Sequence, residues 1–302
     1  MCLFEFETLK TNNVILKKDT IVWKIINVLE WTTDYFKKHG IDEARLKAEL
    51  LLADVLKCNR LQLYQFFDKP LTKIELSKYK KYIKRAVQNE PVQMIIGKVP
   101  FINLELFVSP VSIVPRPETE FLTAMIIEQN SNKKNMRILD IGTGTGCIAL
   151  SLAKAFPDSE IIAVDVSDES LELAKTNQSH NNISNVTFYH NDILNEKIDE
   201  KYNLIVSNPP YIPLDEYREL QPEVKNWEPA DALTDREQGL TFYHRFAKIF
   251  PENLNTDGVF YLEIGSGQAK SISNIFKSEI FTINFLEDLN HIQRFVQGRI
   301  NY

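Results

Sequence analysis

Apolar residues near the start of the chain recur at the spacing of an α-helix. Ile21, Ile25, Val28 and Leu29, followed by 31–35, recur at helical spacing, which predicts an amphipathic helix. Gly40 ends this pattern, and Asp42 is placed to cap a second helix over 43–56. After a short apolar stretch at 61–67, Thr72 is placed to cap a lysine-rich helix over 73–88. The pattern predicts a small helical bundle over residues 19–89, with residues 1–18 as an N-terminal extension.

The pattern then changes to short apolar runs. Residues 92–97 and 104–108 are predicted to be strands of a β-hairpin, which makes 90–114 a linker. A helix over 121–129 follows, opened by the stretch 115–120. Pro117 suits its first turn, and Glu118 and Glu120 complement the helix dipole.

Four buried strands follow, over 136–141, 161–164, 185–190 and 202–207. A helical pattern over 147–154 follows the first of them. Another helix is predicted over 240–250, and further strands over 258–264, 281–285 and 295–300. Strands alternating with helices indicate an α/β fold with a largely parallel, Rossmann-like sheet.

A glycine-rich loop joins the first of these strands to its helix. It consists of Gly142, Thr143, Gly144, Thr145 and Gly146. Strand, glycine loop and helix is an arrangement that cradles nucleotides, because the backbone can approach the ligand closely. The spacing is G-x-G-x-G and not the G-x-G-x-x-G of dinucleotide-binding enzymes. This favours a ligand without a pyrophosphate, S-adenosylmethionine above all, over NAD or FAD. A glycine-rich turn without a ligand is the alternative.

Polar residues follow the next two strands. Asp165 lies about 20 residues beyond Gly146, at the place of an acid that accepts hydrogen bonds from both ribose hydroxyls. Asp192 can accept from the amino group of adenine, and Ile193 can pack on the ring; a turn or cap residue is the alternative for Asp192. Because open α/β sheets bind ligands at the carboxyl ends of their strands, we expect these residues to share one site.

The fourth strand ends in Asn208, Pro209, Pro210 and Tyr211. Prolines cannot donate to a sheet ladder, so the strand stops here and leaves backbone carbonyls without neighbouring N–H groups. Asn208 adds an amide oxygen, and Tyr211 adds a flat ring. This acceptor-rich notch suits a planar NH2 group, of a side-chain amide or a nucleobase, and predicts N-methylation. An ordinary Asn-Pro turn is the alternative. The segment 213–235, with three prolines and no regular period, is expected to wall the substrate channel.

Composition and charge narrow the classes of protein. With 302 residues, 44% hydrophobic and 25% charged, the chain can form one large or two modest globular domains. It has no long apolar run, no signal-peptide pattern and only scattered cysteines, so we expect a cytoplasmic protein without a metal. Residues 1–90 hold 17 basic and 12 acidic residues, while the remainder holds 18 and 29. An acidic catalytic half is a poor surface for duplex DNA, so we expect no stable nucleic-acid complex, no membrane association and a monomer.

Several stretches together resemble the PrmC/HemK family of release-factor glutamine N5-methyltransferases. The similarity spans roughly residues 20–302. Its most specific parts are P-R-P-E-T-E at 115–120 and N-P-P-Y at 208–211, and it also includes D-I-G-T-G-T-G at 140–146, Glu228-Pro229 and G-V-F-Y-L-E-I-G at 258–265.

The resemblance implies a seven-stranded class I methyltransferase domain over 115–302, preceded by the hairpin linker and by a helical domain that docks the substrate. It implies methyl transfer from S-adenosylmethionine to the glutamine of the Gly-Gly-Gln motif in class I peptide release factors. Asn208, Pro209 and Tyr211 are then the catalytic group and, with Pro210, the substrate site. Asn208 also contacts the methyl donor, and Arg116 and Thr119 lie near it. The chain departs from the family pattern at Met94, Asn103 and Ile264, where Tyr, Gly and His are usual.

Two other functions remain open. A DNA or RNA base amino-N-methyltransferase uses the same Asn-Pro-Pro-Tyr chemistry on an exocyclic amine, but usually carries a basic target-recognition region. A protein that kept the fold and lost the activity is the second, and the intact glycine loop and Asn208 motif argue against it.

Overall fold

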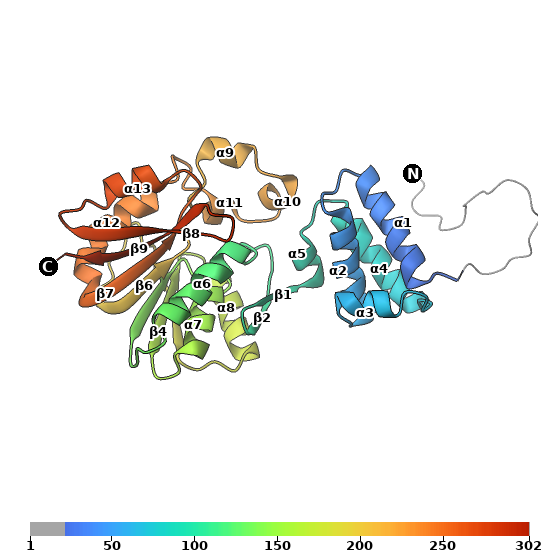
Figure 1. Cartoon of the computed structure of the whole chain (residues 1–302), viewed down its shortest axis with the longest axis horizontal. Helices are drawn as coiled ribbons and strands as arrows, with labels where there is room; N and C mark the ends of the chain where they lie inside the picture. The colour runs from blue at the N-terminus through green and yellow to red at the C-terminus, as the bar shows by residue number, and fades with distance from the viewer. Residues whose placement is uncertain (1–21, 302) are drawn as a thin grey trace, which may run out of the picture. The chain divides into compact units, whose positions relative to one another are not determined.

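The computed structural model of the chain describes residues 22–301 (Figure 1). The chain forms two compact units, of which the first ends at Lys84 and the second begins at Arg85. The extension predicted for residues 1–18 lies outside the described residues.

Unit 1 is helical, as predicted. Its helices are α1 (Ile25–Lys38), α2 (Ala44–Leu56), α3 (Arg60–Gln65) and α4 (Lys73–Ala86), the last two residues of α4 belonging to unit 2. The cap predicted at Thr72 is confirmed: its hydroxyl accepts from the Glu75 N–H at 3.2 Å, and the Glu75 carboxylate accepts from the Thr72 N–H at 2.6 Å. The cap predicted at Asp42 is wrong. Helix α2 begins after Glu43, whose φ of 51° is left-handed, so Asp42 lies one position too early to cap the first turn.

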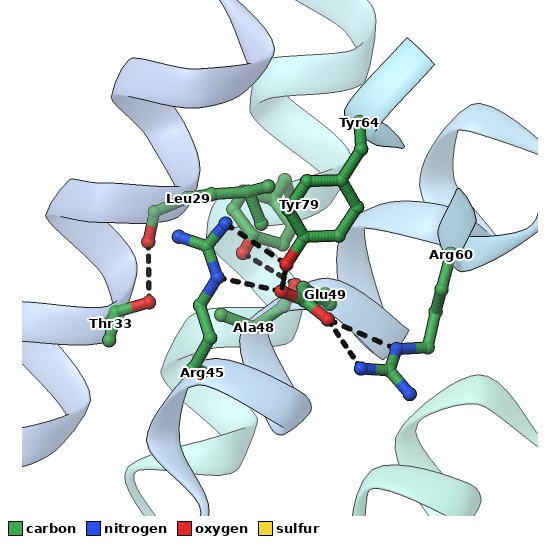
Figure 2. Close-up of polar contacts among 8 residues, drawn as sticks. All are labelled: Leu29, Thr33, Arg45, Ala48, Glu49, Arg60, Tyr64 and Tyr79. Carbon is green, nitrogen blue, oxygen red and sulfur yellow. Dashed lines mark hydrogen bonds and ion pairs between the residues drawn. The ribbon is translucent and has the colours of Figure 1, made fainter. Parts of the chain in front are cut away.

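A buried carboxylate organises the polar contacts of unit 1 (Figure 2). Glu49 on α2, with 1% of its surface exposed, accepts from Arg45 Nε and Arg60 Nη2, each at 2.7 Å, and from the Tyr64 hydroxyl. Burial by itself would raise the pKa of Glu49, but these hydrogen bonds outweigh it and hold the pKa below its ordinary value. The carboxylate thereby ties α2 to α3.

The segment after unit 1 differs from the prediction. Residues 92–97 are not a strand: they form helix α5 (Val92–Ile96), ended by Gly97 at φ 88°, whose N–H donates to Gln93 O at 2.7 Å. The β-branched residues favoured a strand, but Pro91 before the segment and Gly97 at its end are residues that bound a helix. The turn of helix buries three apolar side chains together, including Met94.

A β-hairpin follows, whose second strand is confirmed at its predicted place and whose first strand lies at 98–101 and not at 92–97. Strands β1 (Lys98–Phe101) and β2 (Leu104–Phe107) pair antiparallel. The positive φ of the turn falls on Ile102 and not on Asn103. The Ile102 N–H donates to Glu120 at 2.5 Å, and the Asn103 carbonyl accepts from Lys154 Nζ at 2.7 Å. These bonds attach the hairpin to the rest of unit 2.

The centre of unit 2 is a seven-stranded sheet, as predicted (Figure 1). Its strands are β3 (Arg137–Ile141), β4 (Glu160–Asp165), β5 (Val186–His190), β6 (Tyr202–Ser207), β7 (Leu254–Glu263), β8 (Phe281–Glu287) and β9 (Gln293–Ile300). The order is β5-β4-β3-β6-β7-β9-β8; β3 to β7 are parallel, and β9 is antiparallel to both of its neighbours. The chain order reverses between β3 and β6, and a reversal of this kind opens a crevice at the carboxyl ends of the strands.

Helices cover both faces of this sheet. On one face an apolar core joins the sheet to α6 (Pro117–Gln129), α7 (Cys147–Ala155) and the hairpin. On the other, a core rich in phenylalanine joins it to α12 (Thr241–Asn253) and α13 (Ala269–Ile275). Helix α8 (Asp168–His180) contacts β4 and β5. The helices predicted over 121–129, 147–154 and 240–250 are confirmed, whereas α8 and α13 were not predicted.

The segment 213–235 is more regular than its sequence suggested. It contains three short helices, α9 (Leu214–Arg218), α10 (Pro222–Lys225) and α11 (Ala230–Leu233). Each is preceded by a proline or begins with one, which fixes φ for the first turn. One turn is too short for an apolar period to appear in the sequence.

The described helices are short. The longest have 14 residues, and none between residues 22 and 301 has the length and apolar content needed to cross a membrane.

Candidate functional site

A cavity of about 610 Å³ opens at the carboxyl ends of β3, β4, β5 and β6. Its walls include the glycine loop, the ends of these four strands and part of the segment 213–235. Of the site residues predicted from the sequence, eight line it: Gly142, Gly144, Asp165, Asp192, Ile193, Asn208, Pro209 and Pro210. Thr143, Thr145, Gly146 and Tyr211 do not, and neither do Arg116 and Thr119.

The glycine loop is closely packed against its surroundings. Gly144 has a φ of 54°, and a Cβ there would lie 2.7 Å from the Ser112 hydroxyl. The amides of Gly142 and Thr143 both donate to Val164 O, at 2.9 and 3.0 Å, and the Gly144 amide donates to Asp165. Because the protein itself uses these N–H groups, they are not arranged to cradle a pyrophosphate.

The two threonines of the loop are buried and make hydrogen bonds within the protein interior. Thr143 is buried, and its hydroxyl donates to Asp140 Oδ2 at 2.7 Å. The carbonyl of buried Thr145 accepts from Asn177 Nδ2 at 2.9 Å. Burial raises the pKa of Asp140 to about 7, against the opposing hydrogen bonds from Thr143 and from the Ala149 amide. These contacts fix the shape of the loop.

Asp165 ends β4 at the wall of the cavity. Its Oδ2 accepts from the Gly144 N–H at 2.8 Å, and its Oδ1 accepts from the Ser167 N–H at 2.9 Å. Burial raises the pKa of Asp165, while these backbone donors oppose the shift. Each carboxylate oxygen has a second lone pair, so the group can accept two further hydrogen bonds from a ligand.

Asp192 and Ile193 follow β5. The Asp192 carboxylate accepts from the Leu194 N–H at 3.1 Å and from Asn195 Nδ2 at 2.7 Å, so it stabilises its own loop as well as lining the cavity. Ile193 is buried and presents an apolar surface. Asn191 beside them has a buried amide oxygen without a partner among the described residues, and it too lines the cavity.

The Asn-Pro-Pro-Tyr motif at the end of β6 divides its side chains between cavity and interior. Asn208 Nδ2 donates to the Thr119 hydroxyl at 3.0 Å, while no hydrogen bond within residues 22–301 engages its Oδ1. Tyr211 turns away from the cavity, and its hydroxyl donates to Glu263 Oε1 at 3.2 Å. Burial and the nearby Glu263 raise the pKa of Tyr211, so the phenol stays protonated.

Glu263 lies at the end of β7, behind this motif, and our sequence reasoning gave it no role. Only 1% of its surface is exposed, and its Oε2 accepts from the Thr119 hydroxyl at 2.7 Å. Burial raises its pKa to about 7, against the hydrogen bonds from Thr119 and Tyr211. Its position was a usable signal, because it is a polar residue at the end of a fifth parallel strand.

Arg116 joins the start of α6 to the segment 213–235. Its guanidinium lies 2.6 Å from Glu228 Oε2, and Glu228 is buried. Burial raises the pKa of Glu228, and the charge of Arg116 opposes that shift. The pair therefore positions the segment without contributing to the cavity lining.

Comparison with known proteins identifies the family. The description "PrmC N-terminal domain" matches residues 27–97, and "Methyltransferase small domain" matches residues 115–219. The release factor glutamine methyltransferase of Geobacter sulfurreducens is 37% identical over 280 residues, which cover 92% of this chain and 98% of the relative. The chain belongs to the release factor glutamine methyltransferase family.

Further members of the family are similarly close. The release factor glutamine methyltransferase of Thermodesulfovibrio yellowstonii is 38% identical over 253 residues, 82% of this chain and 90% of the relative. That of Chlorobaculum tepidum is 35% identical over 283 residues, 90% and 96% of the two chains. The chain is accordingly a methyltransferase with the class I fold. Ile264, where the family often has His, is fully buried in the core and does not line the cavity.

Proposed function

We propose that this chain transfers a methyl group from S-adenosylmethionine to the N5 amide nitrogen of the glutamine in the Gly-Gly-Gln motif of class I peptide release factors. The observation that carries the proposal is Asn208, which lines a cavity at the switch point of the sheet and whose amide oxygen has no hydrogen bond among the described residues. The names of the family members support the choice of substrate.

The cavity suits S-adenosylmethionine. Asp165 would hold the ribose hydroxyls, and Asp192 and Ile193 would hold the adenine amino group and ring. Gly142 and Gly144 let the backbone form a close wall for a ligand that has no phosphate, in keeping with loop amides that donate to the protein. When bound, this cofactor supplies an electrophilic methyl group on a sulfonium centre.

The residues at the end of β6 would hold the substrate amide. Asn208 Oδ1 and the Pro209 carbonyl accept one hydrogen each from the NH2 group, and Pro210 lines the same wall. An amide nitrogen is a poor nucleophile because its lone pair is delocalised into the carbonyl. Holding both hydrogens orients the nitrogen for attack, so that its lone pair forms the new N–C bond while the methyl–sulfur bond breaks, with S-adenosylhomocysteine as the leaving group.

The same acceptors stabilise the positive charge that develops on nitrogen, and they act more strongly in a cavity that excludes water. The nitrogen afterwards loses one proton to water, so the product is a neutral secondary amide. We propose Tyr211 as a support for this notch from behind, given its bond to Glu263.

The proposal also assigns a role to each region of the chain. The helical region 19–89 would dock the release factor, with the linker at 90–114 and the methyltransferase domain at 115–302. Release factors act on ribosomes, so the proposed substrate implies a cytoplasmic enzyme.

The experiment is transfer of labelled methyl from S-adenosylmethionine to a purified release factor. A variant of the factor with the motif glutamine changed to alanine and a duplex DNA serve as parallel substrates. Label on the wild-type factor only is the expected result. Equal label on the variant, or label on the DNA, would overturn the proposed substrate.

A further inference from the structure

The side-chain amide of Asn208 has two ends that differ in chemistry. Turned one way, its oxygen faces the cavity and accepts a hydrogen from a substrate NH2 group; turned the other way, it presents its own NH2 and repels that group. An asparagine can rotate between the two at little cost unless a neighbour distinguishes oxygen from nitrogen. The activity proposed above therefore depends on what lies behind Asn208.

The neighbour is the Thr119 hydroxyl, 3.0 Å from Asn208 Nδ2. A hydroxyl has a single hydrogen, so its role toward Asn208 depends on where that hydrogen goes. Thr119 lies on α6, is 3% exposed, and its Oγ1 lies 2.7 Å from Glu263 Oε2. When Glu263 is ionised, its carboxylate takes the hydrogen and leaves the hydroxyl with only an acceptor to offer Asn208.

Glu263 is placed to do this consistently. Its other oxygen, Oε1, accepts from the Tyr211 hydroxyl at 3.2 Å, so both oxygens face donors. Its backbone carbonyl accepts from the buried Tyr243 hydroxyl at 2.8 Å, which fixes the strand end. These hydrogen bonds form a relay from Glu263 on β7 through Thr119 on α6 to Asn208 at the end of β6. The three elements are distant in sequence.

We propose that Thr119 and Glu263 are positioning residues that fix the Asn208 amide with its oxygen toward the cavity. Neither residue lines the cavity, so neither acts on the substrate directly. The Thr119 hydroxyl accepts a hydrogen bond from the Asn208 NH2 group. Glu263 acts by accepting the hydrogen of the Thr119 hydroxyl, so that this hydroxyl cannot donate to Asn208. The inference rests on the proposed function, because it explains how the acceptor for the substrate amide is oriented.

The test compares Thr119→Val with Thr119→Ser in the full chain. Valine keeps the shape and removes the acceptor, whereas serine keeps the hydroxyl. We measure kcat and KM for release-factor methylation, binding of S-adenosylhomocysteine by calorimetry, and the unfolding temperature. Thr119→Val is expected to lower kcat about 10- to 100-fold, with S-adenosylhomocysteine affinity within about twofold of wild type, and Thr119→Ser to retain most of the kcat.

A double-mutant cycle examines the relay itself. If Glu263 acts through Thr119, adding Glu263→Leu to the Thr119→Val variant lowers kcat much less than it does in the wild type. Additive losses, an unchanged kcat in Thr119→Val, or equal losses in the valine and serine variants would each overturn the inference. A wild type that fails to methylate the release factor would instead overturn the proposed function, and this inference with it.

Discussion

At the scale of single residues, the strand ends differ in how much of their hydrogen-bonding capacity the protein already uses. Asp192 binds its own loop, Asp165 binds the glycine loop, and Asn208 keeps an oxygen without a partner among the described residues. Asn208 combines an unpartnered acceptor with a place in the Asn-Pro-Pro-Tyr notch proposed to hold the substrate amide, so it is the first residue to change.

Asn208→Ala is expected to lower kcat about 100-fold or more, because it removes an acceptor that stabilises charge in the transition state. Affinity for S-adenosylhomocysteine should change far less, since other residues hold that ligand. Steady-state methylation and calorimetry on the same preparations measure the two quantities. An unchanged kcat would exclude the proposed role of Asn208.

Asp165→Ala is expected to have the opposite pattern to Asn208→Ala, with its larger effect on cofactor affinity. It removes the proposed acceptor for the ribose and should weaken S-adenosylhomocysteine binding about tenfold or more. Asp165→Asn keeps one acceptor oxygen and serves as the milder control. Wild-type affinity in the alanine variant, measured by the same calorimetric titration, would remove Asp165 from the cofactor site.

Glu263 should make stability depend on pH. Burial raises its pKa to about 7 from 4.5, an effect that Glu118 increases and Arg294 opposes, with Tyr211 and Tyr243 also nearby. Between these values the folded state binds more protons than the unfolded chain, so the free energy of unfolding falls as the pH rises from about 4.5 to 7. Relative to Glu263→Gln, the wild type should therefore lose stability across this range.

Unfolding temperatures of the two proteins at matched pH values measure that difference. The comparison removes the contribution of Asp140, which also has a pKa near 7 and is present in both proteins. Parallel curves would show that Glu263 does not titrate in this range.

At the scale of elements, the turn after β7 holds the Asn-Pro-Pro-Tyr segment in place. Gln268 Oε1 accepts from the Gly265 N–H at 2.8 Å, and its Nε2 donates to Tyr211 O at 2.9 Å and to Gly239 O at 3.3 Å. The backbone of Gly239 approaches Tyr211 so closely that a Cβ would lie 2.0 Å from Tyr211 O. The site depends on this packing of three chain segments.

Gly239→Ala is therefore expected to lower the unfolding temperature and to reduce methylation about tenfold or more, because it displaces the Tyr211 backbone. Gly267→Ala is the matched control. Both glycines have a left-handed φ, +72° and +81°, but a Cβ at Gly267 meets nothing within 4 Å. Gly267→Ala should show only the cost of the backbone conformation, about 1 kcal/mol. Equal losses in both variants would mean that the contact with Tyr211 is unimportant.

At the scale of the whole molecule, each of the two compact units contains buried carboxylates with hydrogen-bond donors from the same unit. In unit 1 the Glu49 cluster ties α2 to α3 (Figure 2), while in unit 2 the buried carboxylates of Asp140 and Glu263 accept from Thr143 and Thr119. A substitution in one network should therefore lower the local stability of its own unit first.

Glu49→Ala is expected to destabilise unit 1 by about 1–3 kcal/mol, since it removes a buried carboxylate whose arginine partners remain able to reach water. Hydrogen exchange followed by mass spectrometry should show faster exchange in α2 and α3 and unchanged exchange in the sheet of unit 2. Glu105→Ala, which removes an exposed ion pair with Lys98, should change little. Uniformly faster exchange throughout the chain would contradict the separation of the two networks.

The sequence by itself determined the elements whose signals are local. The apolar strands and the helices α1, α2, α4, α6, α7 and α12 follow from periods of two and 3.6 and from residues such as Thr72 and Gly40. The glycine loop and the strand-end residues Asp165 and Asn208 could be recognised because chain order places them directly after buried strands. Helix α5 was missed because its β-branched residues resemble a strand, and α9 to α11 because one turn has no period.

Only the tertiary structure decided which atoms of these residues are free. It turned Thr143 and Tyr211 toward the interior, assigned the loop amides to β4, and brought Thr119 and Glu263 together across 144 positions of sequence. Sequence patterns record which residues follow a strand, but a hydrogen bond depends on distance and direction between segments that only the packed sheet brings together. The orientation of the Asn208 amide is therefore set by the fold, although the asparagine itself can be recognised from the sequence.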